Sequence, residues 1–85
     1  MSLVQQDIRE MLASAALLVS VGSRYRRYDG MEIFVVLGLQ YNQMLMCVVV
    51  TAKPTTSNKE IEVPIQEWTS LIESGYGSCP KYILL

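Results

Sequence analysis

The sequence predicts one small α+β domain, in which an N-terminal helix precedes an antiparallel sheet that curls into a half-open barrel. Apolar residues at helical spacing open the chain. Several β-rich segments follow, separated by short turns, a pattern that favours sequential hairpins and a small curled sheet. The chain has 85 residues, which suits a single domain over 1–85, with the helix at 3–18 and the barrel-like sheet at 22–85.

The predicted helix covers residues 3–18. Its apolar residues recur at intervals of four and three and therefore share one face. They are Val4, Ile8, Met11, Ala15 and Leu18. Ser2 and Gln5 have the spacing of a capping box at its start. Residues 15–19 are apolar all round, so we expect them to be buried on most sides, and Gly22 ends the segment.

Residues 24–28 are predicted to form an exposed or edge strand. Asp29 and Gly30 follow it as a typical type I′ hairpin turn, which needs a positive φ at both residues. A β-branched and aromatic run at 32–37 predicts the returning strand, and Gly38 predicts a bulge in it.

A second hairpin is predicted after that strand. Asn42 and Gln43 indicate its turn, and residues 44–51 form a nearly continuous apolar strand, which indicates that both of its faces are covered. A polar loop at 53–59 leads to residues 60–63, which alternate as in a strand with one solvated face.

The last quarter of the chain is predicted to be a helical turn and a strand. Apolar residues at helical spacing place a short helix or helical turn within 65–74. Residues 75–78 are glycine-rich and indicate a loop, and residues 82–85 are apolar and indicate a short final strand.

The residue inventory argues against catalysis. The chain has no histidine, the commonest general base and metal ligand. Its two cysteines, Cys47 and Cys79, have no companion ligands at metal-binding spacing. Glu60 and Glu62 share a strand face, which is typical of a solvated face. We therefore expect no enzyme, no catalytic residue, no metal and no cofactor.

Charge and cysteine content indicate a cytoplasmic protein. The net charge is −1, so the chain lacks the wide basic field that suits nucleic acids or anionic membranes. The apolar run at 11–21 follows acidic residues and is too short to span a bilayer, which argues against a secretory signal and a membrane helix. We expect both cysteines to be reduced.

The apolar content predicts self-association. Hydrophobic residues make up 51% of the chain and charged residues 18%, more apolar side chains than a small core hides. A homodimer packed through Val4, Ile8, Met11 and Ala15 would cover the surplus. In the alternative, the same helical face packs on the chain's own sheet.

The segment Arg24, Tyr25, Arg26, Arg27 and Tyr28 is the first candidate partner or nucleic-acid site. Arginines suit phosphates, and tyrosines suit stacking on bases. In the alternative, the charges protect an edge strand from aggregation.

Tyr41 and Trp68 are further candidate contacts for a partner. Aromatic side chains clustered at one rim of a small barrel would suit a bound peptide, and Tyr41 lies beside a predicted turn. In the alternative, Trp68 fills the core.

The stretch Gly22-Ser-Arg-Tyr25-Arg-Arg-Tyr28-Asp-Gly30-Met-Glu32-Ile-Phe-Val35-Val-Leu-Gly38-Leu resembles the opening of short bacterial and phage proteins of uncharacterised function that have an SH3-like barrel. Pro64 and Trp68 match their late proline and closing aromatic residue. The resemblance covers residues 22–73 and leaves out the N-terminal helix. It implies an SH3-like barrel and no activity.

These observations predict a small non-enzymatic interaction module, dimeric, that binds a protein partner. Phage- or plasmid-type regulators and inhibitors of host proteins are of this kind. The alternative is a nucleic-acid-binding protein that uses the Arg/Tyr strand at 24–28.

Overall fold

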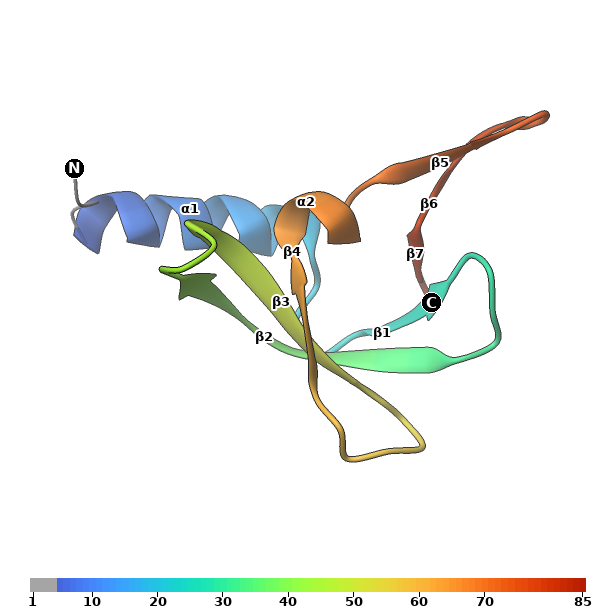
Figure 1. Cartoon of the computed structure of the whole chain (residues 1–85), viewed down its shortest axis with the longest axis horizontal. Coiled ribbons are helices and arrows are strands. Elements are labelled where there is room, and N and C mark those ends of the chain that lie inside the picture. Colours follow the sequence, from blue (N-terminus) through green and yellow to red (C-terminus); the bar gives the residue numbers. More distant parts are fainter. Residues whose placement is uncertain (1–4) are drawn as a thin grey trace.

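The chain folds as a helix followed by antiparallel strands, which confirms the predicted α+β class (Figure 1). The computed structural model describes residues 5–85, except for the side chain of Ser74. The elements are α1 (Gln5–Leu18), β1 (Arg24–Arg27), β2 (Ile33–Asn42), β3 (Cys47–Pro54), β4 (Ile61–Pro64), α2 (Ile65–Trp68), β5 (Leu71–Ser74), β6 (Gly77–Pro80) and β7 (Tyr82–Leu84).

Five of the strands form one sheet in the order β4-β3-β2-β1-β7, with every neighbouring pair antiparallel. The strand β1 lies between β2 and β7, so Tyr25 faces Phe34 on one side and Leu84 on the other. No ladder joins β4 to β7 among residues 5–85, so the sheet is open rather than a closed barrel.

The helix α1 ends at Leu18, as predicted, and packs on β2 and β3. Its predicted first residues and the capping box at Ser2 lie outside the described residues. The expected burial of residues 15–19 on most sides is wrong. Only one face meets the sheet, so Ala15 and Val19 are buried, whereas Leu17 is 88% exposed and Leu18 65%.

The link from α1 to β1 depends on Gly22. Its φ is +88°, a conformation that glycine adopts without strain, and its N–H donates to the Val36 carbonyl at 2.8 Å. The Val36 N–H in turn donates to the Ser23 carbonyl at 3.1 Å. This pair of bonds ties the end of the helix segment to the sheet.

Two predictions for β1 are wrong. The strand is not an edge strand, because it pairs with β2 and β7. The turn after it is not type I′, because only Gly22, Met46 and Gly77 have a positive φ among the described residues. The chain instead makes a wider turn over residues 28–32, in which the Gly30 N–H donates to the Arg27 carbonyl at 3.3 Å.

The hairpin of β2 and β3 matches its prediction in part. The register shifts between Val36 and Gly38, which confirms the bulge. The four residues Cys47–Val50 are all buried, which confirms that both faces are covered. Residues 44–46 belong to the turn rather than the strand, because the Asn42 side chain accepts a bond from the Leu45 N–H at 2.9 Å.

The helical prediction for residues 65–74 is correct only for α2. The hydroxyls of Thr69 and Ser70 donate to the carbonyls of Ile65 and Glu67, which ends the helix after one turn. The next residues form β5 where the helix was predicted, and β5 pairs with β6, which begins within the predicted loop at 75–78. This hairpin extends away from the rest of the molecule (Figure 1). The radius of gyration is accordingly 13.7 Å, compared with about 12 Å for a compact chain of this length.

The core lies between α2, the sheet and the end of α1. Its aliphatic part consists of Val19, Val36, Val50, Ala52 and Val63. Its aromatic part consists of Tyr25, Phe34, Trp68 and Tyr82. The rings of Trp68 and Tyr82 stack at 3.9 Å, and Tyr25 meets Trp68 edge-on at 5.3 Å. These contacts join α2 to the two strands β1 and β7.

Two further findings concern the sequence predictions. Neither Cys47 nor Cys79 forms a disulfide. No helix between Gln5 and Leu85 is long and apolar enough to cross a membrane.

Candidate functional site

Two of the three arginines of β1 form contacts with the turn that follows the strand. The Arg26 Nη1 atom donates to the carbonyls of Arg27 and Gly30 at 3.2 and 3.1 Å. The Arg27 Nε lies 3.3 Å from an Asp29 carboxylate oxygen. Its guanidinium carbon lies 5.9 Å from the centre of the Tyr82 ring. Of the three arginines of β1, only Arg24 is exposed and has no contact of this kind with another described residue.

The aromatic candidates divide between core and surface. Tyr25 and Trp68 are buried, and the Tyr25 hydroxyl accepts a bond from the Ser20 N–H at 2.8 Å. Trp68 therefore occupies the core position that was the alternative to a partner contact. Tyr28 is exposed and Tyr41 half-buried. The structure does not bring these four side chains to one rim, because two of them lie inside.

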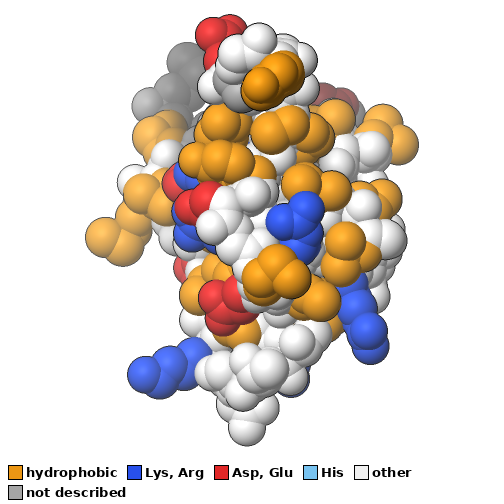
Figure 2. Space-filling model, turned by 90° about the vertical axis from the view of Figure 1, so that its right-hand side faces the viewer, with side chains coloured by type: hydrophobic (Ala, Val, Ile, Leu, Met, Phe, Trp, Pro, Cys, Tyr) orange, Lys and Arg blue, Asp and Glu red, His pale blue; other side chains and the backbone are white. Residues whose placement is uncertain are grey.

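Charges are scattered on the face from which the hairpin points. Figure 2 shows basic and acidic side chains standing singly among hydrophobic ones there, without one continuous basic area. The Arg/Tyr strand is thus not part of a broad cationic surface on this face.

Of the predicted oligomer stripe on the first helix, one residue is buried within the chain and two are partly exposed. Val4 lies outside the described residues. Ala15 is buried against the chain's own sheet. Ile8 and Met11 are half-buried, and Met11 faces the groove described next.

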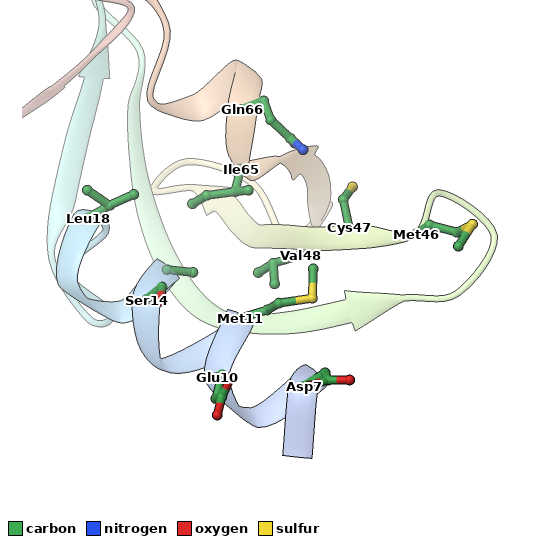
Figure 3. Close-up of a pocket in the computed structure, with 11 residues that line it drawn as sticks. Asp7, Glu10, Met11, Ser14, Leu18, Met46, Cys47, Val48, Ile65 and Gln66 are labelled. Atoms are coloured by element: carbon green, nitrogen blue, oxygen red, sulfur yellow. The ribbon is translucent and has the colours of Figure 1, made fainter. Parts of the chain in front are cut away.

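A groove of about 500 Å³ separates α1 from α2 and the start of β3 (Figure 3). Its walls come from three segments that are far apart in the sequence. They contribute Asp7, Glu10, Met11, Ser14, Ala15 and Leu18 from α1, Met46 from the β2–β3 turn with Cys47 and Val48 from the start of β3, and Ile65 and Gln66 from α2. Met11 and Val48 lie toward one another in its middle.

The groove has an apolar floor and an acidic lip. Ala15, Cys47 and Val48 are buried beneath it. The lip carries the two exposed carboxylates of Asp7 and Glu10, and no Lys or Arg within 5–85 lines the groove. Neither carboxylate forms an ion pair with a residue between Gln5 and Leu85. This end of the groove therefore has a negative charge that the described residues do not neutralise.

Met46 forms the outer edge of the groove. Its side chain is 63% exposed, and its φ is +53°, in the left-handed region. A residue other than glycine is strained there by about 1–3 kcal/mol. Met46 is the only such residue from Gln5 to Leu85. Backbone strain thus coincides with the outer edge of the groove.

A second depression of about 300 Å³ lies beside the aromatic core. Leu18, Leu71 and Leu84 stand exposed at its edge, and we refer to these three residues as the leucine face. The remaining lining residues are Tyr25, Trp68, Thr69, Pro80 and Tyr82. None of them is an acidic or basic side chain, so the surface is apolar and uncharged at neutral pH. Leu18 belongs to both depressions.

One ion pair fixes the base of the hairpin. The Lys81 Nζ lies 2.8 Å from a Glu67 carboxylate oxygen and donates a hydrogen bond to it. This bond lowers the pKa of Glu67 and raises the pKa of Lys81 from their ordinary values. Burial raises the pKa of the neighbouring Tyr82 hydroxyl, which the Arg27 charge partly opposes.

Sequence reasoning missed the groove because its walls meet only after folding. One signal was present. Asp7, Glu10, Met11, Ser14 and Leu18 follow the spacing of a single helical face. The carboxylates and the apolar residues could thus have been assigned to one surface, although nothing in the sequence shows what faces it.

Comparison with known proteins shows a fold relation only. No family model matches the chain, and no curated protein matches it. The structure is similar to the crystal structure of a protein of the DUF1653 family from Bordetella bronchiseptica, with a TM-score of 0.63 and 21% sequence identity. The match covers 75% of this chain and 85% of that one. It agrees with the resemblance to small bacterial proteins of uncharacterised function and shows the fold alone.

Proposed function

We propose that this chain is a small non-enzymatic interaction module, active in a reducing compartment such as the cytoplasm, that forms a homodimer and binds a protein partner. The observation that carries the proposal is the apolar surface that the fold leaves outside, in the groove and on the leucine face. Contiguous apolar surface on a soluble domain typically marks an interaction site. Phage- or plasmid-type regulators and inhibitors of host proteins, suggested by analogy at the level of the fold, act in this way.

We further propose that the sheet is a half-open barrel of the SH3-like type. The supporting observations are the meander from β1 to β4, the single helical turn α2 after it, and a final strand that returns to pair with β1. In such a small barrel, binding surfaces lie at the rims, where α2 and the connecting segments meet.

The leucine face is the surface that we assign to the dimer. A two-fold interface brings the same surface of two copies together, so a surface with charges of one sign only would meet that sign on its partner. Leu18, Leu71 and Leu84 carry no charge and surround a depression without charged lining. Two copies can therefore meet there without desolvating an unpaired ion.

Light scattering coupled to size-exclusion chromatography tests the dimer. The expected result is the mass of two chains, reduced to one chain by Leu71→Glu. Met44→Glu is the matched control, because Met44 is also exposed but lies in the β2–β3 turn. A monomer at every concentration would contradict self-association. A dimer that persists in Leu71→Glu would show that another surface is used.

A further inference from the structure

We propose that the groove between α1 and α2 binds an amphipathic helix of a partner protein, and that Lys or Arg residues on that helix pair with Asp7 and Glu10. The inference rests on the proposed interaction function and assigns it a site and a class of ligand. It concerns a surface different from the proposed dimer face, with which it shares only Leu18.

The shape of the groove suits the apolar side of a short helix. Its volume of about 500 Å³ lies in the range of specific binding clefts. Its floor of Ala15, Cys47 and Val48 is buried and apolar. An amphipathic helix binds such a groove through anchors at positions i, i+3 or i+4, and i+7.

A partner peptide bound instead as an extended strand would find few unpaired backbone groups in the groove. The strand β3 is paired with β2 along most of its length, and with β4 from Val49 onward. Cys47 and Val48 are the part of β3 in the groove that β4 does not cover. Two residues of edge are too few for strand addition, which favours a helix as the bound form.

Two methionines line the groove. Met11 lies inside it, and Met46 stands at its outer edge (Figure 3). Unbranched thioether side chains adapt to anchors of different shape, and methionine-rich surfaces are typical of sites that bind amphipathic helices. The strained backbone at Met46 supports this role, because strain concentrates at binding sites.

The negative charge of Asp7 and Glu10 favours a ligand with basic residues. Asp7 lies in the first turn of α1, where the helix dipole stabilises a carboxylate, but Glu10 lies beyond that turn. Four residues after Glu10 stands Ser14, so α1 offers it no cation at the usual spacing. Two basic residues on the bound helix would neutralise the two carboxylates.

A second copy of this chain, docked groove to groove, would not supply the cations that Asp7 and Glu10 lack. No Lys or Arg lines the groove, so two grooves brought together offer no cation to Asp7 and Glu10. Such a contact would desolvate carboxylates without a partner. Charge complementarity therefore favours a basic partner protein over a second copy.

The test uses two fluorescein-labelled helical peptides and the full chain. Both peptides carry leucines at i, i+4 and i+7. One has lysines beside them, and its twin has glutamates at the same positions. Fluorescence anisotropy measures each dissociation constant. We expect the lysine peptide to bind more tightly by roughly two- to thirtyfold, as two charge pairs of ordinary strength imply.

Matched variants locate the binding. Asp7→Asn with Glu10→Gln should remove the preference for lysine, whereas Glu60→Gln with Glu62→Gln should leave it unchanged. Ser14→Phe should abolish binding by filling the groove. Ala13→Phe is its control, because Ala13 is exposed but does not line the groove. Circular dichroism checks that each variant folds. The charge variants, at exposed positions, decide the result if Ser14→Phe does not fold.

Three results would overturn the inference. Equal affinity for the two peptides would contradict charge selection. Unchanged affinity in Ser14→Phe would place the peptide elsewhere and leave the proposed function standing. No binding of either peptide would remove the groove as a helix site, and the proposed function would then be judged by the light-scattering result, which does not involve the peptides.

Discussion

Apolar side chains are buried at one end of this molecule and remain partly exposed at the other. At the aromatic end, β1, α2 and β7 bring Tyr25, Trp68 and Tyr82 into contact, and all three are buried. At the groove end, α1, α2 and the start of β3 meet around open space, and Met46 remains largely exposed. Apolar composition alone therefore does not decide which side chains become core.

The difference follows from how each end is held. The aromatic end is held by two backbone ladders, since β1 pairs on both sides. The groove end is bounded by helices, which form no ladder with the sheet and are positioned by side-chain packing and by the link through Gly22. Hydrogen bonds between paired strands fix the distance between those strands at roughly 5 Å. A helix packed on a sheet has no such constraint, so a groove can remain between the helix and the sheet. The first end is closely packed, whereas the second keeps an open groove.

The largest expected effect is at the aromatic end. Trp68→Ala should lower the free energy of unfolding by about 3–5 kcal/mol, because it leaves a cavity beneath Tyr25 and Tyr82. Trp68→Phe should cost clearly less. It keeps a ring and removes an indole N–H that is buried without an acceptor. Urea unfolding measures both. Equal losses in Trp68→Ala and Met11→Ala would contradict the division between the two ends.

The link between the two ends should be the next most sensitive. Gly22→Ala should cost about 1–2 kcal/mol, because its φ of +88° is unfavourable for a residue with a Cβ. No atom lies within 4 Å of the added Cβ, so the cost is one of backbone conformation. Gly38→Ala is the matched control, with equal space and no left-handed φ. Thermal unfolding should show a loss for the first variant and little change for the second.

A change at the groove lip should have a smaller effect of opposite sign. Met46→Gly should raise the free energy of unfolding by about 1 kcal/mol or less, because glycine relieves the left-handed strain but adds chain entropy. Met44→Gly, in the same turn without a positive φ, should not stabilise the chain. A loss of stability in Met46→Gly would mean that its side chain supports the fold rather than the groove.

The smallest effect concerns the ion pair of Glu67 and Lys81. The lowered pKa of Glu67 stabilises the fold above its ordinary value of 4.5, and this stabilisation is lost as pH falls through the lowered pKa. The raised pKa of Lys81 stabilises the fold below its ordinary value of 10.5 and is lost as pH rises through the raised pKa. Glu67→Gln should thus lower stability near neutral pH and have less effect in acid.

A double-variant cycle isolates this pair. In a Lys81→Met background, Glu67→Gln should cause no further loss of stability near neutral pH. A loss of the same size in both backgrounds, measured by urea unfolding, would show that Glu67 acts without Lys81.

The sequence predicted the elements that depend on local pattern. Helical spacing gave the end of α1 at Leu18, and Gly38 marked the bulge. The uninterrupted apolar run gave the buried strand around Cys47–Val50. In each case the determining residues are neighbours along the chain, so their spacing carried the information.

Elements that depend on distant pairing were missed. Leu71 and Ile72 have helical spacing from Trp68, yet they pair with Pro80 and Cys79 in a hairpin. The arginines of β1 suggested an edge strand, but β7 covers that edge from the far end of the chain. The groove was missed for the same reason, because only the folded chain brings α1 beside β3 and α2.

The continuity of β6 and β7 has a consequence for folding kinetics. One strand, interrupted only at Lys81, completes both the hairpin and the five-stranded sheet, and it pairs Tyr25 with Leu84, which lie far apart in the sequence. Contacts of such long sequence separation slow folding, because a large loop must close before they form. Until β7 docks, one edge of β1 lacks its strand. The docking rate of this last strand therefore sets how long the nascent chain is open to pairing with its neighbours and to aggregation.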